Sequence, residues 1–507
     1  MKNLITTAIF FFVIFLFSNT VRAECNGSIS IYVPSKEYNT IEEAINKIKM
    51  AYPKQLIQNK EVYTKAIINV SSDYVEKNEI NIDRDCLEII GQTNGDKKPT
   101  IIREDFSGDH PAVVSIEGND IKLENFNVQG KDFVKSDKEK CNVDIFGILA
   151  LNEETQKENG FKNIKILKNT VYKIGHENNC GDAHGIVVWG EKQTPIEDVW
   201  VVGNTATNLR LGSSEAVTIK NNVKNFHVND NTIFNVNNIG IDIVGFEENS
   251  KDKPTVGEIV GNVISDLQEG NAAYPEVAGV YIDGGTGTDF DAGKILIEKN
   301  TIFKFGFGIQ VGAENEKEMP NVKIQFVVIR NNVIFNNLIT GIGIGHEPDK
   351  EKMKSYVWNC NVVNNTLYGN GTKTYSGAWS KGELHFGSYY KDTLKNIIIK
   401  DNIIFARMNQ HLVRAEGNNL SPDVEFSGNL FWAENSKNLW AWKEAGYYYQ
   451  QSDIFDNKGI SQLNKLQIKG DNNFWINPQF ILQYPSKRED FQLKENNPAK
   501  GKGNLIF

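Results

Sequence analysis

Residues Ile295–Phe305 read ILIEKNTIFKF, a short strand of alternating apolar residues, then Asn300, then a second short strand. The same order recurs along most of the chain, for example in IKILKNTVYKI (Ile164–Ile174) and FHVNDNTIFNV (Phe226–Val236). Equivalent asparagines follow one another at intervals of 27 to 38 residues: Asn169, Asn204, Asn231, Asn262, Asn300, Asn332, Asn365, Asn402 and Asn429. Internal repetition of this kind overrides the three domains that chain length alone suggests.

Most repeats contain a third short strand that begins with glycine, as in GIVVWGE (185–191), GIDIVGFE (240–247) and GVYIDGG (279–285). Three short strands per repeat describe one coil of a solenoid plus a variable loop. Stacked coils pair their strands in parallel and bury one continuous core of Ile, Val, Leu and Phe. The recurring asparagine suits a bend that needs left-handed backbone geometry, and its amide can bond to the asparagine of the next coil.

Other repeat architectures fit this pattern less well. A leucine-rich repeat needs its L-x-x-L-x-L spacing, and a left-handed hexapeptide helix needs a strict six-residue rhythm. A propeller needs four longer antiparallel strands per blade. The sequence therefore predicts an all-β protein, a right-handed parallel β-helix with an amino-terminal capping helix.

The two ends of the chain depart from the repeat. Residues 1–23 combine a basic start, an apolar run and a small-residue site, which predicts a signal peptide that takes no part in the fold. Residues 24–60 are expected to form a strand and a capping helix, because NTIEEAINKIKMAY (39–52) is amphipathic and offers a Thr40/Glu43 capping box. Residues 61–435 are expected to form the β-helix, and residues 436–507 to cap it or fold back along it.

Composition limits the partners of the chain. The net charge is −9 and no block of basic residues stands out, which disfavours nucleic acid and anionic membranes. No stretch after the signal peptide approaches the roughly 18 apolar residues of a spanning helix. We expect an exported, soluble monomer, secreted or periplasmic, whose partner is a polysaccharide. Binding an acidic polymer would require a local basic cluster or a bridging cation.

The five cysteines are too few for a disulfide-built scaffold, and they contain no C-x-x-C pair that would indicate a zinc or redox site. In an oxidising compartment one or two bridges can form, and chain order favours Cys25 with Cys86 and Cys141 with Cys180. Cys360 is expected to be a buried apolar filler.

From about Ser30 to its end, the chain resembles the secreted right-handed parallel β-helix proteins of the pectate-lyase-like superfamily. The resemblance rests on TIEEAI (40–45), on the N-x-[IV]-[FY] coils and on the NPQF…DFQL…NPAKGKG tail (477–503). It implies the β-helix fold. The superfamily includes polysaccharide lyases, glycoside hydrolases, sugar epimerases and adhesins, so the activity it implies is broad. The catalytic signature of the pectate lyases themselves is absent from this sequence.

Strand geometry predicts which side chains of the third strands leave the barrel. Successive residues alternate, so Ile241 and Ile243 point inward while Asp242 and Val244 point outward. Aligned on their glycines, the third strands form one outer patch: Val187, Trp189, Thr218, Lys220, Asp242, Val244, Tyr281, Asp283, Gln310, Gly312, Gly343, Gly345, Glu383 and His385, beside the loop acids Glu247, Glu314 and Glu347. An aromatic ring, carboxylates, an amide and a phenol suit a sugar, although exposed strand faces are also polar for solubility alone.

From this patch we predict the site residues. The predicted catalytic residues are Asp242, Asp283, Glu215, Lys220 and Tyr281, and the predicted substrate-binding residues are Trp189, His184, Gln310, His385, Arg210 and Glu247. Glu215 either pairs with Arg210 at a bend or forms a carboxylate pair with Asp242 on the next coil. Calcium bound by Asp242, Asp283 and Glu247 is a further hypothesis, since hard cations take several oxygen ligands.

The loop GHENNCGDAHG (175–185) holds His176, Cys180, Asp182 and His184 within nine residues. These four side chains could bind a metal, but a disulfide at Cys180 would remove one ligand. We favour a loop that contacts substrate, because His184 leads directly into the strand that carries Trp189.

The sequence is compatible with three functions. A lyase or epimerase acting on uronic acids needs a base for the C5 proton, here Lys220, Tyr281, His385 or His184, and a cation for the substrate carboxylate, here Lys220, Arg210 or calcium. A glycoside hydrolase needs two carboxylates, and the offset of Asp242 and Asp283 favours inversion over retention. The third function is carbohydrate binding without catalysis. We favour an enzyme on an acidic polysaccharide, of lyase type.

Overall fold

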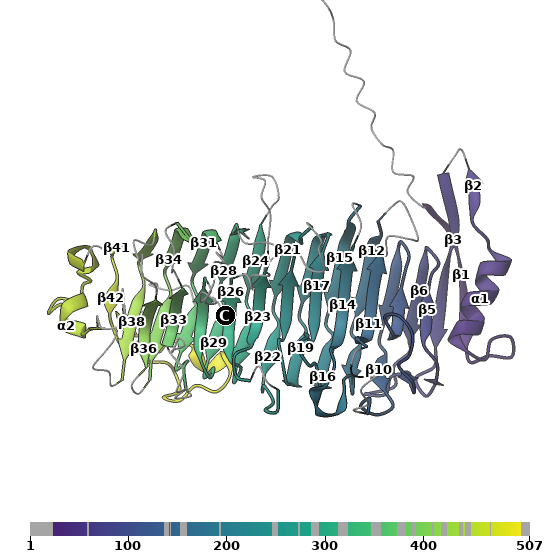
Figure 1. Cartoon of the computed structure of the whole chain (residues 1–507), viewed down its shortest axis with the longest axis horizontal. Coiled ribbons are helices and arrows are strands. Elements are labelled where there is room, and N and C mark those ends of the chain that lie inside the picture. The colour runs from purple at the N-terminus through teal and green to yellow at the C-terminus, as the bar shows by residue number, and fades with distance from the viewer. Residues whose placement is uncertain are drawn as a thin grey trace, which may run out of the picture.

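The computed structural model describes residues 24–57, 60–135, 141, 143–152, 160–191, 194–245, 252–271, 274–284, 294–312, 323–345, 356–372, 382–387, 392–407, 410–416, 423–434, 440–441, 448–466 and 468–497. The predicted signal peptide at 1–23 lies outside these residues. The described strands stack along one long axis, with helices α1 (Ile41–Ala51) and α2 (Gln451–Ile454) at opposite ends (Figure 1). No helix among the described residues has the length and apolar character needed to cross a membrane.

The first sheet contains the strand that precedes the repeated asparagine in each coil. Within the described residues its neighbours pair in parallel except β2 with β3. Its strands are β1 (Glu24–Val33), β2 (Gln55–Ile57), β3 (Lys60–Val70), β6 (Leu87–Gly91), β9 (Ile121–Glu124), β12 (Lys162–Leu167), β15 (Ile196–Val202), β18 (Val223–Asn229), β21 (Thr255–Val260), β24 (Ile295–Glu298), β27 (Lys323–Gln325), β28 (Val327–Arg330), β31 (Tyr356–Val363), β34 (Leu394–Lys400), β37 (Val424–Ser427) and β41 (Lys469–Asp471).

The second sheet contains the strand that follows the asparagine. Its strands are β4 (Val75–Glu76), β7 (Thr100–Arg103), β10 (Asn127–Gly130), β13 (Thr170–Tyr172), β16 (Thr205–Leu209), β19 (Thr232–Val236), β22 (Val263–Ser265), β25 (Thr301–Phe303), β29 (Val333–Phe335), β32 (Thr366–Tyr368), β35 (Ile403–Ala406), β38 (Leu430–Ala433) and β42 (Phe474–Trp475). The ladders of the first two sheets therefore continue past the expected boundary at residue 435, to Asp471 and Trp475.

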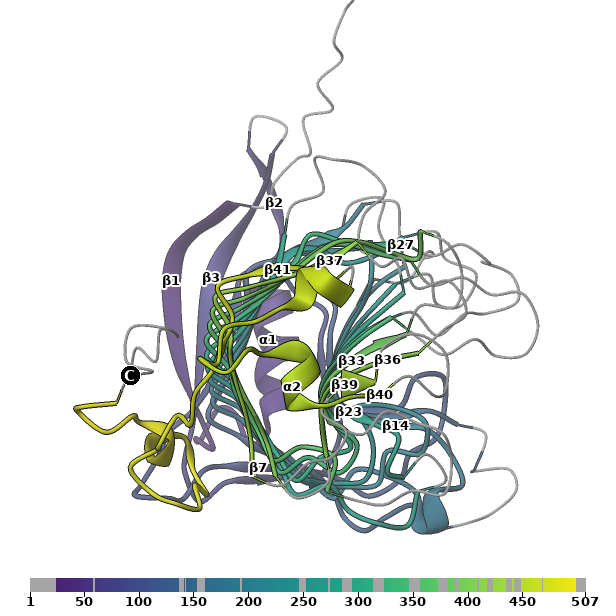
Figure 2. The same ribbon diagram turned by 90° about the vertical axis from the view of Figure 1, so that its left-hand side faces the viewer.

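The third sheet contains the glycine-led strands. They are β5 (Ile80–Ile82), β8 (Ala112–Ile116), β11 (Ile145–Asn152), β14 (Ala183–Gly190), β17 (Val217–Asn221), β20 (Ile241–Val244), β23 (Ala278–Asp283), β26 (Phe307–Val311), β30 (Thr340–Ile344), β33 (Gly382–Gly387), β36 (His411–Glu416), β39 (Trp440–Ala441) and β40 (Tyr448–Tyr449). The order first, second, third sheet repeats along the chain. The protein is thus a right-handed parallel β-helix, as the repeat predicts, and Figure 2 looks along its axis.

The interior is one apolar core. Alternate residues of all three sheets, such as Ile243 and Ile282 on the third, are completely buried within it. Glycine begins most third strands because the chain turns a corner there with almost no room: a Cβ on Gly240 would lie 2.5 Å from the carbonyl oxygen of Gly279, and one on Gly308 would lie 2.4 Å from a side-chain carbon of Ile334. These contacts are too close for any larger residue in the same backbone.

A ladder of buried asparagines joins the corners between the first and second sheets. The Oδ1 of Asn262 accepts hydrogen bonds from both N–H groups of Asn231, backbone and side chain, at 2.9 and 3.0 Å, and Asn262 donates in the same way to Asn300. The same contacts run from Asn169 to Asn473, one coil beyond the last predicted member. The left-handed backbone belongs to the residue before each asparagine, such as Asp230 (φ 55°), and not to the asparagine as we expected.

The amino-terminal end is closed as the sequence predicts. Thr40 caps α1 by accepting from the backbone N–H of Glu43, whose carboxylate accepts from the backbone of Asn39. The face of α1 that includes Ile41 and Ile45 joins the core. Both favoured disulfides are present, Cys25–Cys86 and Cys141–Cys180, and Cys360 is buried and free.

The carboxyl-terminal segment both caps the barrel and folds back along it. Short 3₁₀ helices at Leu463–Leu466 and Arg488–Phe491 interrupt it, and a third such helix lies at Glu177–Asn179. Phe480 and Phe491 pack on the outer face of the second sheet against rings that include Phe335 and Tyr368. The guanidinium of Arg488 donates to backbone oxygens of Lys299, Asn300 and Asn331, many coils earlier in the chain.

Candidate functional site

The outer face of the third sheet carries two rows of side chains in register. We call the first the central row: Asn81, Ser115, Leu149, Val187, Thr218, Asp242, Tyr281, Gln310, Gly343, His385 and Arg414. We call the second the flanking row: Leu151, Trp189, Lys220, Val244 and Asp283. Neighbours along a row are one strand apart, about 4.8 Å. The register is the one predicted from the glycine alignment.

These side chains leave the barrel but do not lie open to solvent. Asp242 and His385 are each 3% exposed, and Trp189, Tyr281, Asp283 and Gln310 are also buried. Part of the reason is that the outer face has apolar clusters of its own, which include Phe146, Trp189 and Leu149 at one end and Tyr281 with Phe307 nearer the middle. These side chains point away from the barrel interior, but they are buried. The expectation of an exposed polar patch was therefore wrong.

His184 and Glu215 meet at the start of adjacent third strands. Nδ1 of His184 lies 3.2 Å from Oε2 of Glu215, and the Thr218 hydroxyl donates to the same oxygen at 2.9 Å. The imidazole ring stacks on Phe146, with 5.0 Å between ring centroids and 4° between the planes. Both side chains are largely buried, so the imidazole is held by a carboxylate at one nitrogen and by an aromatic face. We call His184, Glu215 and Thr218 the histidine cluster.

Arg210 does not take part in the histidine cluster. Its guanidinium lies over the ring of Phe133, 4.1 Å from the centroid, and the side chain is exposed. Among the described residues no ion pair joins Arg210 to Glu215, so the first of the two readings of Glu215 is wrong. The second reading, a carboxylate pair with Asp242, stays a prediction. The contacts observed for Glu215 are those to His184 and Thr218.

Lys220 and Trp189 form a pair on neighbouring coils of the flanking row. The ammonium group lies 4.1 Å from the centroid of the indole, a cation–π contact. The indole also meets the edge of the His110 ring, with 5.3 Å between centroids. Trp189 therefore holds Lys220 and His110 in place, and its own face is not open for stacking on a sugar.

The two central carboxylates lie on adjacent coils with an offset of two residues. Asp242 is opposite Tyr281, and Asp283 is opposite Val244, which places their Cα atoms about 8 Å apart by strand geometry. Asp283 accepts a hydrogen bond from the backbone N–H of Gly284 at 2.6 Å. The pairing confirms the offset on which the expectation of inversion rests.

Gln310 and His385 continue the row toward the carboxyl end. The amide of Gln310 donates to the backbone oxygen of Gly345 at 2.8 Å and crosses over Gly343, where a Cβ would lie 2.0 Å from its Oε1. Gly343 therefore makes room for this amide and does more than flatten the face. The next side chain after His385 is that of Arg414, a cation that the alignment did not reach because the strand HLVRAE lacks the leading glycine.

Glu383, which we expected beside His385 on the outer face, points into the barrel instead. It is fully buried, and its carboxylate accepts from the backbone and the side-chain N–H groups of Asn370 at 2.9 and 2.6 Å. Glu383 stands where other third strands have the corner glycine, so its side chain enters the corner and ends a short ladder that runs through Asn337 and Asn370. Burial raises the pKa of Glu383 well above its usual value.

The loop before β14 is tied down by contacts within the protein. Cys180 is in a disulfide with Cys141, Nε2 of His176 contacts the backbone oxygen of Val143 at 3.0 Å, and Asp182 accepts from the backbone of Ser213. Burial lowers the pKa of His176. Cys180 is therefore no metal ligand, and of the four loop residues only His184 reaches the outer face cluster.

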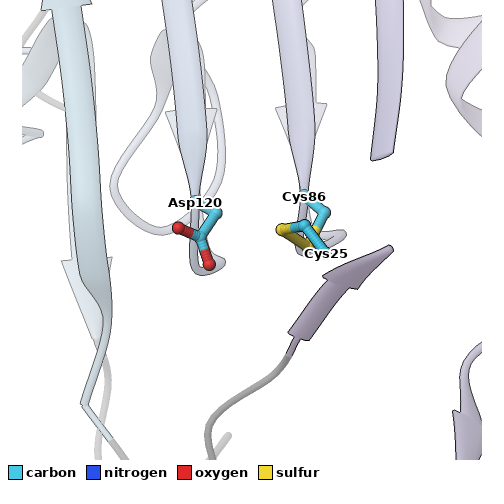
Figure 3. A group of neighbouring side chains, drawn as sticks. All are labelled: Cys25, Cys86 and Asp120. Carbon is cyan, nitrogen blue, oxygen red and sulfur yellow. A yellow bond between two sulfur atoms is a disulfide. The ribbon is translucent and has the colours of Figure 1, made fainter. Parts of the chain in front are cut away.

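One group of three potential metal ligands occurs among the described residues, namely Cys25, Cys86 and Asp120 (Figure 3). The two sulfur atoms are bonded to each other, so they cannot serve as thiolate ligands. Glu247 lies outside the described residues, as do Glu314 and Glu347. Calcium at Asp242, Asp283 and Glu247 therefore stays a prediction.

Sequence reasoning missed Phe146, His110 and Arg414 as neighbours of the predicted residues. Phe146 occupies the same strand position as His184 one coil earlier, in the motif DIFGILALN (144–152), whose glycine could have aligned it with the other third strands. His110 lies in a loop, where no periodicity applies. No signal in the sequence places its ring against Trp189.

Comparison with known proteins agrees with this architecture. The structure is similar to the A-module of mannuronan C-5 epimerase AlgE6 from Azotobacter vinelandii, with a TM-score of 0.53 and 13% identity over 87% of this chain and 95% of that module. The A-module of AlgE4 from the same organism gives a TM-score of 0.41 and 11% identity, over 81% of this chain and 94% of that module. The likeness to the AlgE6 A-module supports the fold, a right-handed parallel β-helix.

In sequence, the chain is 27% identical over 404 residues to the uncharacterized protein YwoF of Bacillus subtilis (strain 168), which covers 77% of this chain and 74% of that protein. No family model matches the chain.

Proposed function

We propose that the protein is an exported enzyme that modifies a polysaccharide on the outer face of the third sheet, with the histidine cluster moving the proton. The observation that carries this proposal is the contact of His184 with Glu215 and Thr218. A histidine oriented by a carboxylate is the arrangement that general acid–base catalysis uses. It stands on strand ends of a rigid ladder, which holds it in one geometry.

The direction of proton transfer follows from the partners of His184. A carboxylate only accepts hydrogen bonds, so Nδ1 of His184 carries the proton that Glu215 accepts. Nε2 then has the free lone pair and is the basic nitrogen. After His184 takes a proton, the same carboxylate stabilises the imidazolium ion. A C–H bond beside a sugar carboxylate is the target that suits such a base.

A cation beside the histidine cluster supports a uronic acid at this position. Lys220 is two residues beyond Thr218 on the same strand. Its ammonium group would offset the charge of a substrate carboxylate while the C5 proton is removed, so a lyase or epimerase is favoured. Arg414 lies six strands further along the central row, about 29 Å from Thr218, and is too far away to act on the same sugar. In this scheme Asp242, Tyr281 and Gln310 bind sugar hydroxyls as the floor of the site.

Two further observations support export and a carbohydrate substrate. Both disulfides are closed, which suits the oxidising environment outside the cytoplasm. The similar A-module of AlgE6 carries the name of an enzyme that acts at C-5 of mannuronan, a polysaccharide. The second candidate function, an inverting glycoside hydrolase, draws its support from the offset of Asp242 and Asp283.

Incubation of the purified protein with polyuronates, glycosaminoglycans and neutral plant glycans tests the proposal. A lyase produces a conjugated double bond that absorbs in the ultraviolet, a hydrolase produces reducing ends without it, and an epimerase exchanges the C5 proton with deuterium from the solvent. We expect ultraviolet absorbance or exchange, and its loss in His184→Ala with an unchanged thermal midpoint.

Full activity of a folded His184→Ala protein would contradict the role of the histidine cluster. Reducing ends that instead depend on Asp242 and Asp283 would establish the hydrolase. Binding of a polysaccharide with none of the three products would establish a protein that binds carbohydrate without catalysis.

A further inference from the structure

A pocket of about 270 Å³ opens on the amino-terminal coils of the same outer face. Its floor is apolar and buried, formed by Ala112, Leu149 and Leu151. Its rim is polar and comes largely from the loop between β7 and β8 and from the neighbouring strands: Glu79, Asn81, Arg103, Ser107, Asp109, His110, Ser115 and Glu117. The volume falls just below the roughly 300–1,000 Å³ of pockets for drug-sized ligands, so it suits one small cyclic unit.

The pocket is continuous with the face that carries the histidine cluster. Asn81, Ser115 and Leu149 are the first three members of the central row, and Ser115 lies three coils before Thr218, about 14 Å along the sheet. A single sugar unit cannot reach from one to the other, whereas a chain of linked units can.

Aromatic rings separate the pocket from the histidine cluster and contact both. His110, on the pocket rim, lies 6.0 Å from the ring of Phe146 and 5.3 Å from the ring of Trp189, centroid to centroid. The opposite side of this wall contacts the cluster, because Phe146 stacks on His184 and Trp189 lies under Lys220. The pocket is therefore a neighbour of the proposed reaction centre and not part of it.

The charges of the pocket select against an anion. Arg103 forms an ion pair with Glu79, and its other donors bond to the backbone oxygens of Asp105, Ser107 and Ala112. The guanidinium thus holds the loop and offers no free pair of N–H groups to a carboxylate ligand. The remaining acids of the lining, Asp109 and Glu117, would repel a uronate and can accept hydrogen bonds from sugar hydroxyls.

We infer that this pocket binds a glycosyl unit without a carboxylate, so that the polymer acted on alternates or mixes uronate and uncharged units and is not a homopolymer of uronic acids. The inference rests on the proposed function for the uronate that faces Lys220. It adds a second unit of the substrate, further along the same polymer, which the apolar floor and the acidic rim recognise.

The inference is tested by calorimetric titration of the whole protein with three hexasaccharides. The first contains only uronate units, the second is an uncharged glucan fragment, and in the third uronate units alternate with uncharged hexosamine derivatives. We expect the alternating probe to bind most tightly. Ser115→Phe, which fills the pocket, should weaken this binding by at least tenfold. Gln129→Phe, which adds the same ring on the second sheet, should not change it, and the thermal midpoints identify any variant that fails to fold.

Charge reversal gives a second and independent measurement. Asp109→Lys should strengthen binding of the homopolymeric uronate severalfold, whereas Asp96→Lys, in an exposed loop outside the pocket, should leave the affinity unchanged. The inference is overturned if Ser115→Phe binds the alternating probe as the wild type does, if the homopolymer binds most tightly, or if none of the probes binds.

These titrations require no turnover, so they separate the two proposals. Binding that depends on Ser115 in a protein with no activity would refute the enzyme and retain the pocket. Turnover that depends on His184 and is unchanged in Ser115→Phe would retain the enzyme and refute the pocket.

Discussion

Asp242 and Glu215 differ in how well the sequence alone predicts the placement of their side chains. Asp242 lies inside a strand, where alternation fixes the direction of its side chain, and the structure confirms that direction. Glu215 lies just before a strand, where no period applies, so its contact with His184 could not be read from spacing. The sequence placed both histidine and glutamate near the face without indicating that they meet.

The replacement Glu215→Gln tests this contact with little change of shape. A glutamine amide can donate to Nδ1 of His184, which would favour the tautomer whose Nε2 carries the proton and cannot act as a base. Activity should fall by about 10²-fold or more, within the range of general acid–base catalysis. The measurement is kcat/KM across pH, with a thermal midpoint for each protein.

The chain offers a matched control for Glu215→Gln. His227 and Glu258 form a similar pair on the first sheet, with 2.7 Å between Nδ1 and Oε1. Glu258→Gln should therefore retain activity. Equal activity of the two variants would remove Glu215 from the mechanism.

For Glu383, the alternation of residues along the strand gave the wrong direction of the side chain. The sequence alignment assigned it by counting from His385, but the position belongs to the corner, where the backbone bends and most of the other coils carry glycine. Its two bonds from Asn370 keep it inside the barrel. A carboxyl group with a raised pKa in the core makes the stability of the protein depend on pH.

The sign of this dependence follows from the raised pKa. The neutral carboxyl stabilises the fold fully below the unfolded value of 4.5, and that contribution is lost as pH rises toward the folded pKa, at up to about 1.4 kcal/mol per pH unit. In Glu383→Gln this term is absent. Urea unfolding of both proteins at several pH values above 4.5 should show the wild type losing stability relative to the variant as pH rises. A difference that is constant with pH would contradict a neutral Glu383 in the fold.

At the scale of the element, the asparagine ladder defines where each coil bends. Each member is fully bonded to its neighbours, while the preceding residue supplies the left-handed backbone, as Gly261 does before Asn262. The repeated asparagine was visible in the sequence. The sequence did not show that the preceding residue, and not the asparagine, takes the left-handed conformation, because asparagine itself also favours that geometry.

Removal of one ladder member should be costly. Asn262→Ala leaves both N–H groups of Asn231 without their acceptor and the carbonyl of Val228 without its side-chain donor, all buried. At about 1–3 kcal/mol for each unsatisfied buried group, we expect a loss of at least 3 kcal/mol in the free energy of unfolding. Urea denaturation measures it, with the exposed Asn457→Ala as a control near zero. A loss below 1 kcal/mol would show that the ladder adds little to stability.

At the scale of the whole molecule, the carboxyl-terminal tail connects distant coils. Its rings cover Phe335, Tyr368 and Phe405 on the second sheet, while Arg488 reaches backbone that precedes it by 157 to 189 residues. The sequence indicated that the repeat fades and that the tail caps the barrel or folds back. The structure shows both, and the route along the second sheet could not be predicted because it depends on contacts that no repeat encodes.

Phe491→Ala tests whether the carboxyl-terminal tail stabilises the barrel. This ring is completely buried, and its removal should cost about 3–5 kcal/mol, as for other large core residues. Leu482, which lies in the same segment and is 48% exposed, supplies the control, and Leu482→Ala should cost little. Urea midpoints of the two variants give the comparison. Similar midpoints would mean that the tail adheres without stabilising the barrel.

The asparagine ladder has a consequence for the evolution of such a chain. Every rung presents the same acceptor and the same two donors to its neighbours, as Asn204, Asn231 and Asn262 do. A segment that runs from one rung to the next can be duplicated or lost, and the rungs brought together still match. The outer face thus lengthens or shortens by whole coils, each about 4.8 Å, so the length of the face that we propose for polymer binding changes in fixed increments.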